Sequence, residues 1–211
     1  MNVMEQKTKM DDIEIGAIYK DDNGEFFKID YANLEDSPRD FAGIKEMTFY
    51  TWLRGYKSPD PCLKTFPDFC EEFGAKNASE LLEKMEKKGY YVKPVYVLIH
   101  SGIHYSLRSF SDHWDSGWGG IIFCERNEGV YDEETLDNMA QDEVSEYDAW
   151  ANGEIYVAEQ LDDEAAPEAI SFPFFARSNE EWSKCLKEAI ESIGIKGQDC
   201  YSKAKQKVIL E

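Results

Sequence analysis

The chain has 211 residues, of which 42% are hydrophobic and 14% aromatic, and a formal net charge of −20. This length and aromatic content suit one large domain or two small ones with a substantial core, and they exclude a disordered chain. A charge this negative disfavours direct binding to nucleic acid or to anionic membranes and favours basic protein surfaces.

Turn signals and hydrophobic periodicity predict the secondary structure in chain order. Strands are typical of short alternating or aromatic-rich runs, and helices of a capping residue followed by apolar residues three and four positions apart. We expect strands at 15–20, 25–31, 46–53, 91–102, 121–125 and 154–161 and over AISFPFFA, and helices after Thr65, after Asn77, over 133–151 and after Ser178. The 133–151 helix is the clearest, because Leu136, Val144 and Tyr147 recur at helical spacing on one face.

The predicted fold class is α+β: a mainly antiparallel sheet with about four helices packed on it, in a single domain. This domain is expected to span 12–195, between a flexible leader (1–11) and a basic C-terminal tail (196–211). We expect the 133–151 helix to lie on a sheet that contains both 121–125 and 154–161.

Two features suggest a cytoplasmic protein without a cofactor. No apolar run approaches the length of a transmembrane helix, and MNVMEQKTKMDD lacks the apolar segment of a secretory signal. The five cysteines are odd in number, widely spaced and without a CxxC pair, which predicts free thiols in a reducing compartment. Neither GxGxxG nor GxxxxGK[ST] is present, so no phosphate-binding loop is predicted.

Three motifs occur in order: HSG at 100–102, WDSGWGGIIF at 114–123 and EYDAWANGEIY at 146–156. Together with DSPRDF at 36–41, they resemble a family of phage and mobile-element proteins over roughly 25–161. Trp118 stands where that family has glutamine, and Asp112-His113 replaces a Cys-Pro pair. The resemblance implies a phage or mobile-element setting and supplies no activity. Strongly acidic proteins of such elements often inhibit host defence.

The loop SDHWDSGWGG precedes the 121–125 strand. Its first interpretation is structural. Asp115 and Ser116 would bond the backbone of a tight turn, and Trp114 would be buried beneath it. His100 would be satisfied by the same turn, and Trp118 would be displayed at the surface. On this interpretation, Asp115→Asn lowers stability and abolishes no chemical step.

Two chemical interpretations of the same loop stay open. His100 could act as a general base oriented by Asp115, with a neighbouring serine as nucleophile, in a hydrolytic or nuclease-like site. Alternatively His104, Asp112 and His113 could bind zinc or manganese. Neither a GxSxG elbow nor a standard zinc-ligand spacing accompanies these residues.

Acidic residues are concentrated between 125 and 168, where sixteen of them occur with Arg126 as the only basic residue. On the 133–151 helix, like charges lie four residues apart, and each such pair costs about 0.2–0.5 kcal/mol. A segregated acidic surface of this kind can occupy the nucleic-acid-binding groove of another protein. The alternative is a face that merely keeps the chain soluble.

We therefore expect a non-enzymatic inhibitor of a host defence system, of the anti-CRISPR or anti-restriction kind. Its partner would be a basic, nucleic-acid-binding host protein, such as a defence nuclease or a restriction complex. The alternatives are a small hydrolase or nuclease-like enzyme and a replication or packaging accessory protein. The expected partner-binding residues are Glu133, Glu134, Asp137, Asp142, Glu146, Asp148, Asp162, Asp163 and Glu164, with Trp118 and Trp150 as hydrophobic anchors.

Overall fold

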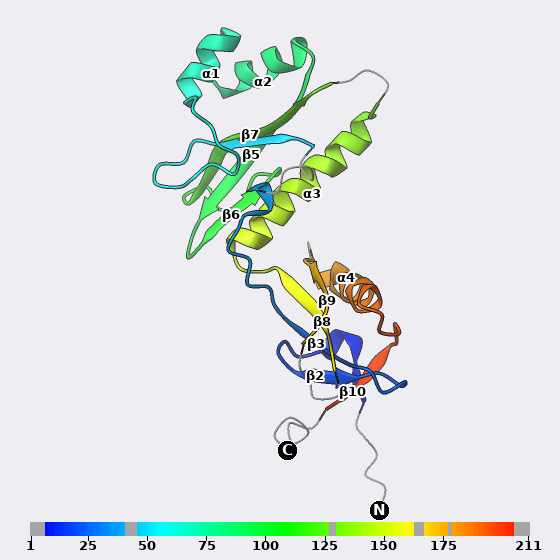
Figure 1. Cartoon of the computed structure of the whole chain (residues 1–211). Coiled ribbons are helices and arrows are strands. Elements are labelled where there is room, and N and C mark those ends of the chain that lie inside the picture. The colour runs from blue at the N-terminus through cyan, green and yellow to red at the C-terminus, as the bar shows by residue number, and fades with distance from the viewer. Residues whose placement is uncertain (1–6, 41–45, 127–129, 163–166, 177–178, 205–211) are drawn as a thin grey trace, which may run out of the picture. The chain divides into compact units, whose positions relative to one another are not determined.

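A computed structural model describes residues 7–40, 46–126, 130–162, 167–176 and 179–204. These residues form four α-helices and ten strands in two antiparallel sheets, which confirms the predicted α+β class (Figure 1). The chain divides into two compact units: unit 1 is Met1–Asn33 with Gly153–Glu211, and unit 2 is Leu34–Asn152.

Unit 1 is built from the first and last elements of the chain, and unit 2 from all the elements between them. The strands are β1 (Lys7–Lys9), β2 (Ile18–Lys20), β3 (Phe26–Tyr31), β4 (Thr48–Thr51), β5 (Tyr90–Ile99), β6 (Ile103–Ser106), β7 (Ser116–Glu125), β8 (Tyr156–Leu161), β9 (Pro167–Phe174) and β10 (Cys200–Lys203). The helices are α1 (Phe66–Phe73), α2 (Ala78–Lys87), α3 (Glu133–Ala151) and α4 (Asn179–Ser192), with short 3-10 helices η1 (Met10–Asp12) and η2 (Pro38–Asp40). Unit 2 is therefore an insertion between β3 and β8 of unit 1.

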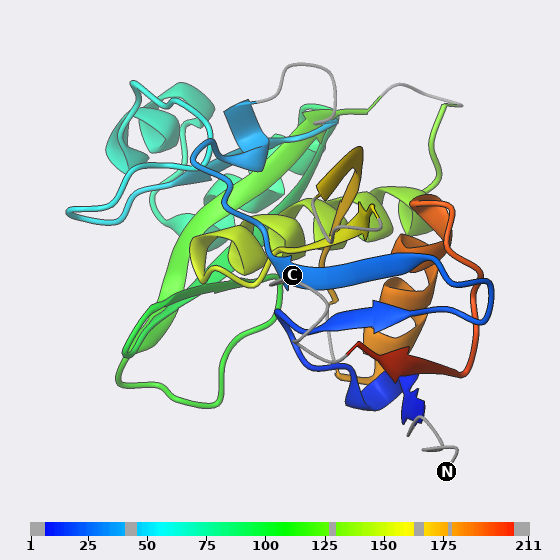
Figure 2. The same ribbon diagram turned by 60° about the horizontal axis from the view of Figure 1, so that its bottom comes forward.

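Unit 1 contains a six-stranded sheet in the order β1-β10-β2-β3-β8-β9. The expected strands at 15–20 and 25–31 correspond to β2 and β3, which pair antiparallel on either side of Asn23-Gly24. Phe27 and Ile29 of β3 are fully buried against α4, which presents Ile190 to the same core. Figure 2 shows β2 and β3, in blue, side by side with α4, in orange, behind them.

Both segments expected to lie outside the domain contribute strands to this sheet. β1 pairs with β10, with Thr8 opposite Tyr201, and β10 pairs in turn with β2. Tyr201 is fully buried, and Met10 is 8% exposed. The expected leader and tail are therefore wrong over 7–11 and 196–204, because the polar residues around Tyr201 concealed a short buried strand.

Unit 2 contains a four-stranded sheet in the order β4-β7-β5-β6 with helices on both faces. Helix α3 covers one face with Leu136, Val144 and Tyr147, as its periodicity predicted. Helices α1 and α2 cover the other face (Figure 1). The predicted caps Thr65 and Asn77 accept backbone hydrogen bonds at the starts of α1 and α2.

The expectation that 121–125 and 154–161 share a sheet is wrong. β7 pairs with β4 and β5 in unit 2, whereas β8 pairs with β3 and β9 in unit 1. Alternating polarity shows which face of a strand is buried, but it does not identify the neighbouring strand. The chain returns to unit 1 directly after α3 ends at Ala151.

Strand β7 contains a bulge that changes which face its residues occupy. It begins at Ser116, within the glycine-rich loop of the sequence, and not at 121. Gly120 pairs with Val95 while Trp118 pairs with Tyr96, so the intervening Gly119 has no partner in the ladder. The extra residue places Trp118 on the α1–α2 face.

Two further observations concern the length of the helices and the state of the cysteines. No helix among the described residues is both long enough and apolar enough to cross a membrane. All five cysteines are free thiols, as predicted.

Candidate functional site

Two acidic side chains at the start of α3 are paired with basic residues from other elements of unit 2. Glu133 binds Arg126 at 2.6 Å. Asp137 lies 2.8 Å from the Lys93 ammonium and accepts a 2.7 Å hydrogen bond from the Tyr91 hydroxyl. Lys93 and then Tyr91 hold the pKa of Asp137 below its ordinary value. The negative charge of this end of α3 is therefore partly neutralised by cations of the protein itself.

A buried ion network holds the middle of α3. Arg39 is 4% exposed and donates to Asp60 at 2.7 and 3.2 Å, to Glu143, and to the carbonyl oxygen of Met47 at 2.6 Å. Burial alone would lower the pKa of Arg39, but hydrogen bonds to Asp60 and Glu143 outweigh it and raise the pKa. Glu143 also accepts from the backbone amides of Glu46 and Met47, at 2.8 and 3.0 Å. The network joins η2, β4 and α3.

Acidic side chains also cover the two edges of the unit 2 sheet. Asp148 of α3 accepts a 2.8 Å hydrogen bond from the amide of Tyr105 in β6. Asn152 donates to the neighbouring main-chain carbonyl of β6 at 2.9 Å. On the other edge, Asp60 accepts from the amide of Phe49 in β4 at 2.7 Å. These contacts occupy backbone groups that an exposed edge strand would offer to other chains.

The like-charge repulsion expected along α3 is therefore partly offset by cations from elsewhere in unit 2. The compensating cations, Arg39, Lys93 and Arg126, lie outside the helix in sequence and reach it only through the fold. Glu146 also differs from its expected solvent-facing position: it is half-buried, and burial raises its pKa.

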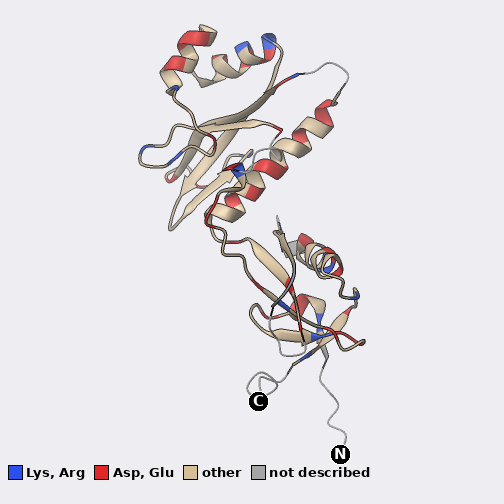
Figure 3. Ribbon diagram, viewed as in Figure 1, with Lys and Arg blue, Asp and Glu red and all other residues tan. Residues whose placement is uncertain are grey.

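An exposed stripe remains on the outward side of α3. It consists of Glu134, Asn138 and Asp142, all exposed and four residues apart, and we call it the outer stripe. Helix α3 contains seven acidic residues and no lysine or arginine. Figure 3 shows these acidic residues in red along the helix.

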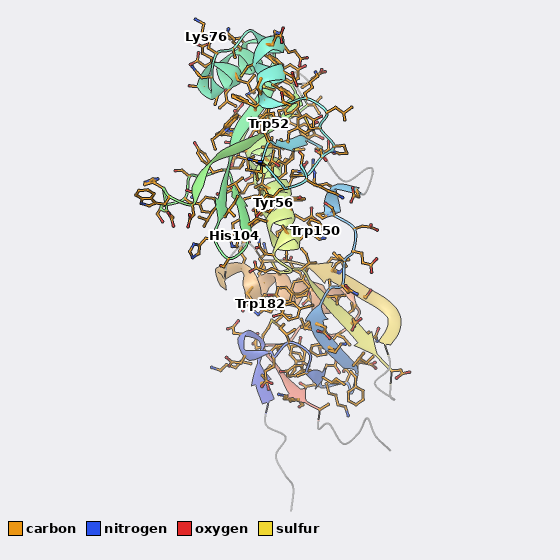
Figure 4. All side chains as sticks on the ribbon, turned by 90° about the vertical axis from the view of Figure 1, so that its left-hand side faces the viewer. Trp52, Tyr56, Lys76, His104, Trp150 and Trp182 are labelled. Atoms are coloured by element: carbon orange, nitrogen blue, oxygen red, sulfur yellow. The ribbon has the colours of Figure 1, made fainter. Side chains whose placement is uncertain are left out.

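The remaining expected contact residues do not join this stripe. Asp162 belongs to unit 1, and Asp163 and Glu164 lie outside the described residues. Trp150, labelled in Figure 4, is half-buried: its ring lies 5.4 Å from that of Tyr147, and its Nε1 donates to the carbonyl of Leu34 at 3.4 Å. Trp150 is therefore a packing residue of unit 2.

The positions expected for two tryptophans are reversed. Trp114 is 97% exposed, whereas Trp118 is half-buried with its ring centroid 5.7 Å from Trp52 and 4.9 Å from Phe66. Trp114 precedes β7, and the bulge at Gly119 turns Trp118 toward the core. Trp118 is therefore not the displayed anchor that was expected.

Asp112, and not Asp115, braces the loop. One carboxylate oxygen of Asp112 accepts from the amides of Trp114 at 2.9 Å and Asp115 at 3.4 Å. These backbone hydrogen bonds lower the pKa of Asp112. The Ser116 hydroxyl donates to the carbonyl of Asp112. The Asp115 carboxylate instead lies 3.0 Å from Nδ1 of His100.

We predict that Asp112→Ala speeds amide hydrogen exchange at Trp114 and Asp115, because the substitution removes the acceptor for both amides. Exchange measured by NMR checks this, with Asp115→Asn as the control that leaves both rates unchanged. Since the pKa of Asp112 is lowered, its bracing is present at neutral pH and is lost as the pH falls through that lowered pKa. If these amides exchanged faster only in Asp115→Asn, Asp115 would be the residue that braces the loop.

The His100–Asp115 pair is open to water, with side chains 70% and 45% exposed. A carboxylate at Nδ1 orients an imidazole and leaves Nε2 for proton transfer. The nearby hydroxyls of Ser101 and Ser116 both donate to main-chain carbonyls. Neither of these two hydroxyls is therefore directed to the His100–Asp115 pair.

The structure does not bring His104, Asp112 and His113 together as metal ligands. His104 lies beside α3, with Nδ1 3.3 Å from the Asn152 amide nitrogen and 3.5 Å from Asp148. Among the described residues, no three histidine, cysteine, aspartate or glutamate side chains are grouped to hold a metal ion. The expected metal alternative is therefore wrong.

The fold and surface define an acidic α+β protein of two units with its most acidic helix on unit 2. No protein-family model, curated protein or solved structure matches the chain. The function is therefore argued from the geometry of the residues.

Proposed function

We propose that this chain is a non-enzymatic inhibitor from a phage or mobile genetic element. It acts in the host cytoplasm, where the outer stripe of α3 binds a basic, nucleic-acid-binding surface of a defence nuclease or restriction complex. The main support is that α3 bears seven acidic residues and no basic one, and that Glu134 and Asp142 stay exposed on it. The resemblance of the HSG and WDSG motifs to phage proteins supports the setting.

The outer stripe is suited to this role because its scaffold is rigid. The opposite side of α3 is fixed by fully buried Ala140 and Val144, and its middle is fixed by Arg39. At a rise of 1.5 Å per residue, Glu134 and Asp142 stand about 12 Å apart along the helix. Two fixed negative charges at this separation can engage basic side chains that otherwise contact phosphates. The partner should therefore be unable to bind nucleic acid and this chain at the same surface.

We predict that Glu134→Lys combined with Asp142→Lys weakens partner binding tenfold or more, about 1.4 kcal/mol, without unfolding the chain. Both side chains are exposed, so the fold does not depend on their burial. The measurement is capture from host lysate, identification of the captured protein, and titration of that protein with each variant. Raised salt should weaken the wild-type complex, because exposed charges are screened over about 8–10 Å.

The matched control is Glu83→Lys with Glu86→Lys, which makes the same change in net charge on exposed positions of α2. This control should bind as the wild type does, and DNA or RNA should compete with both. If the two double variants lost affinity equally, or if salt had no effect, the outer stripe would not be the contact surface.

A second candidate function rests on the 3.0 Å contact between His100 and Asp115. This contact leaves Nε2 of His100 available as a general base for a hydrolytic or nuclease-like reaction. Assays with nucleic-acid and ester substrates test it: activity that Asp115→Asn reduces and the α3 variant leaves unchanged would support the enzyme, and absence of activity in the wild type would exclude it.

A further inference from the structure

An open pocket of about 400 Å³ lies in unit 2 on the α1–α2 side of the sheet. Its lining comes from three strands, helix α1 and the segment between β4 and α1. Trp52, labelled in Figure 4, belongs to the same aromatic layer. Five aromatic side chains form the wall of the pocket: Tyr50, Phe69, Phe73, Tyr90 and Phe123.

The rings of this wall meet mostly edge to face, and one pair, Phe69 and Phe73, lies parallel with centroids 6.4 Å apart. The Tyr50 centroid lies 5.7 Å from Phe69 and 5.6 Å from Phe123, at interplanar angles of 68° and 65°. Tyr90 meets Phe123 at 6.1 Å and 71°, and Phe73 at 5.9 Å and 77°. Edge-to-face and offset parallel contacts of this kind can be extended by a further flat ring.

The polar groups of the pocket carry no net charge. The Lys64 ammonium binds Glu72 at 2.7 Å and lies 5.5 Å from the centre of the Phe69 ring. The Cys62 thiol donates to the carbonyl of Lys64 at 3.1 Å. Burial raises the pKa of both the Tyr50 hydroxyl and the Cys62 thiol, so both groups are neutral at physiological pH.

We infer that this pocket binds a small, uncharged, planar aromatic molecule of one or two fused rings. Its volume lies within the range of about 300–1,000 Å³ that is usual for small-molecule sites. Aromatic walls favour a flat ring over an aliphatic one, because only the flat ring adds edge-to-face and stacking contacts. The net charge of −20 disfavours anions, and Lys64 is already paired with Glu72.

This inference is independent of the proposed inhibitory function. The pocket and α3 lie on opposite faces of the unit 2 sheet, since their residues belong to separate core clusters. The α3 variants should therefore leave ligand binding unchanged, and a filled pocket should leave the outer stripe unchanged.

Indole is the probe for the test, with cyclohexanol as a non-planar molecule of comparable size. Alkylation of each cysteine by iodoacetamide is followed by mass spectrometry as the probe concentration rises. Indole should slow the modification of Cys62 at least fivefold, with a saturable dependence on concentration. Cys70, which lies on α1 but does not line the pocket, should react at an unchanged rate and serves as the internal reference.

A second measurement does not depend on cysteine reactivity. Saturation-transfer NMR should detect indole bound to the wild type and to Cys70→Ser, and the signal should be lost in Cys62→Phe, whose side chain fills the pocket. Equal protection by cyclohexanol, equal slowing at Cys70, or no saturation up to the solubility limit of indole would overturn the inference. Circular dichroism of Cys62→Phe confirms that a lost signal reflects a filled pocket and a folded chain.

Discussion

Arg39→Ala should lower the free energy of unfolding of unit 2 by about 3–5 kcal/mol, because it leaves buried carboxylates without their cation. Asp60 is 5% exposed, and Glu143 is also held by this guanidinium. Urea unfolding followed by tryptophan fluorescence measures the loss, since four of the five tryptophans lie in 34–152 and report on unit 2.

Two further substitutions test the cause of this effect. Arg39→Lys should recover only part of the loss, since an ammonium cannot reproduce the separate hydrogen bonds to Asp60, Glu143 and the backbone. Arg126→Ala removes a 39% exposed partner of Glu133 and should cost less than about 1 kcal/mol. A loss below 1 kcal/mol in Arg39→Ala as well would show that the buried network contributes no more than a surface ion pair.

Gly120→Ala should destabilise unit 2 by about 1–3 kcal/mol or more, because β4 leaves no room for a side chain at this position. A Cβ atom on Gly120 would overlap the carbonyl oxygen of Tyr50 and lie 2.9 Å from Cγ2 of Thr51. The carbonyl belongs to the paired backbone and cannot move aside as a flexible side chain would. Urea unfolding and the exchange rates of the β4 amides measure the effect.

Gly117→Ala is the matched control in the same strand. Nothing lies within 4 Å of a Cβ atom at this position, so its effect should stay within about 0.5 kcal/mol. Similar losses of stability in the two variants would mean that the glycines of WDSGWGG are needed for general backbone flexibility. A loss of stability in Gly120→Ala alone would mean that glycine is needed at this position because β4 approaches it closely.

The sequence predicted those elements whose signals are local. The 133–151 helix has the bounds of α3, because its periodic apolar residues and the Asn152-Gly153 stop lie within one segment. Strand β6 has four residues, too few for a clear alternation, and was not predicted. The first half of β7 was also missed, because glycine and serine have low strand preference.

Features that depend on distant residues could not be predicted in this way. Arg39 and Glu143 are 104 positions apart, and no local pattern connects them. Their network gives Glu143 a structural role, whereas counting charges gave every acidic residue of the helix the same role. The exchange of roles between Trp114 and Trp118 has a similar cause, because a bulge is defined by the partner strand β5 as well as by β7.

The insertion of unit 2 between paired strands has a consequence for how such a chain can change. Tyr31 is paired with Tyr156, and the amide of Ala32 donates to the carbonyl of Ile155 at 2.8 Å. The two connections to 34–152 are therefore anchored one strand spacing apart, about 5 Å. The paired strands β3 and β8 therefore hold both ends of the inserted segment, and an insertion or deletion within that segment need not break their ladder.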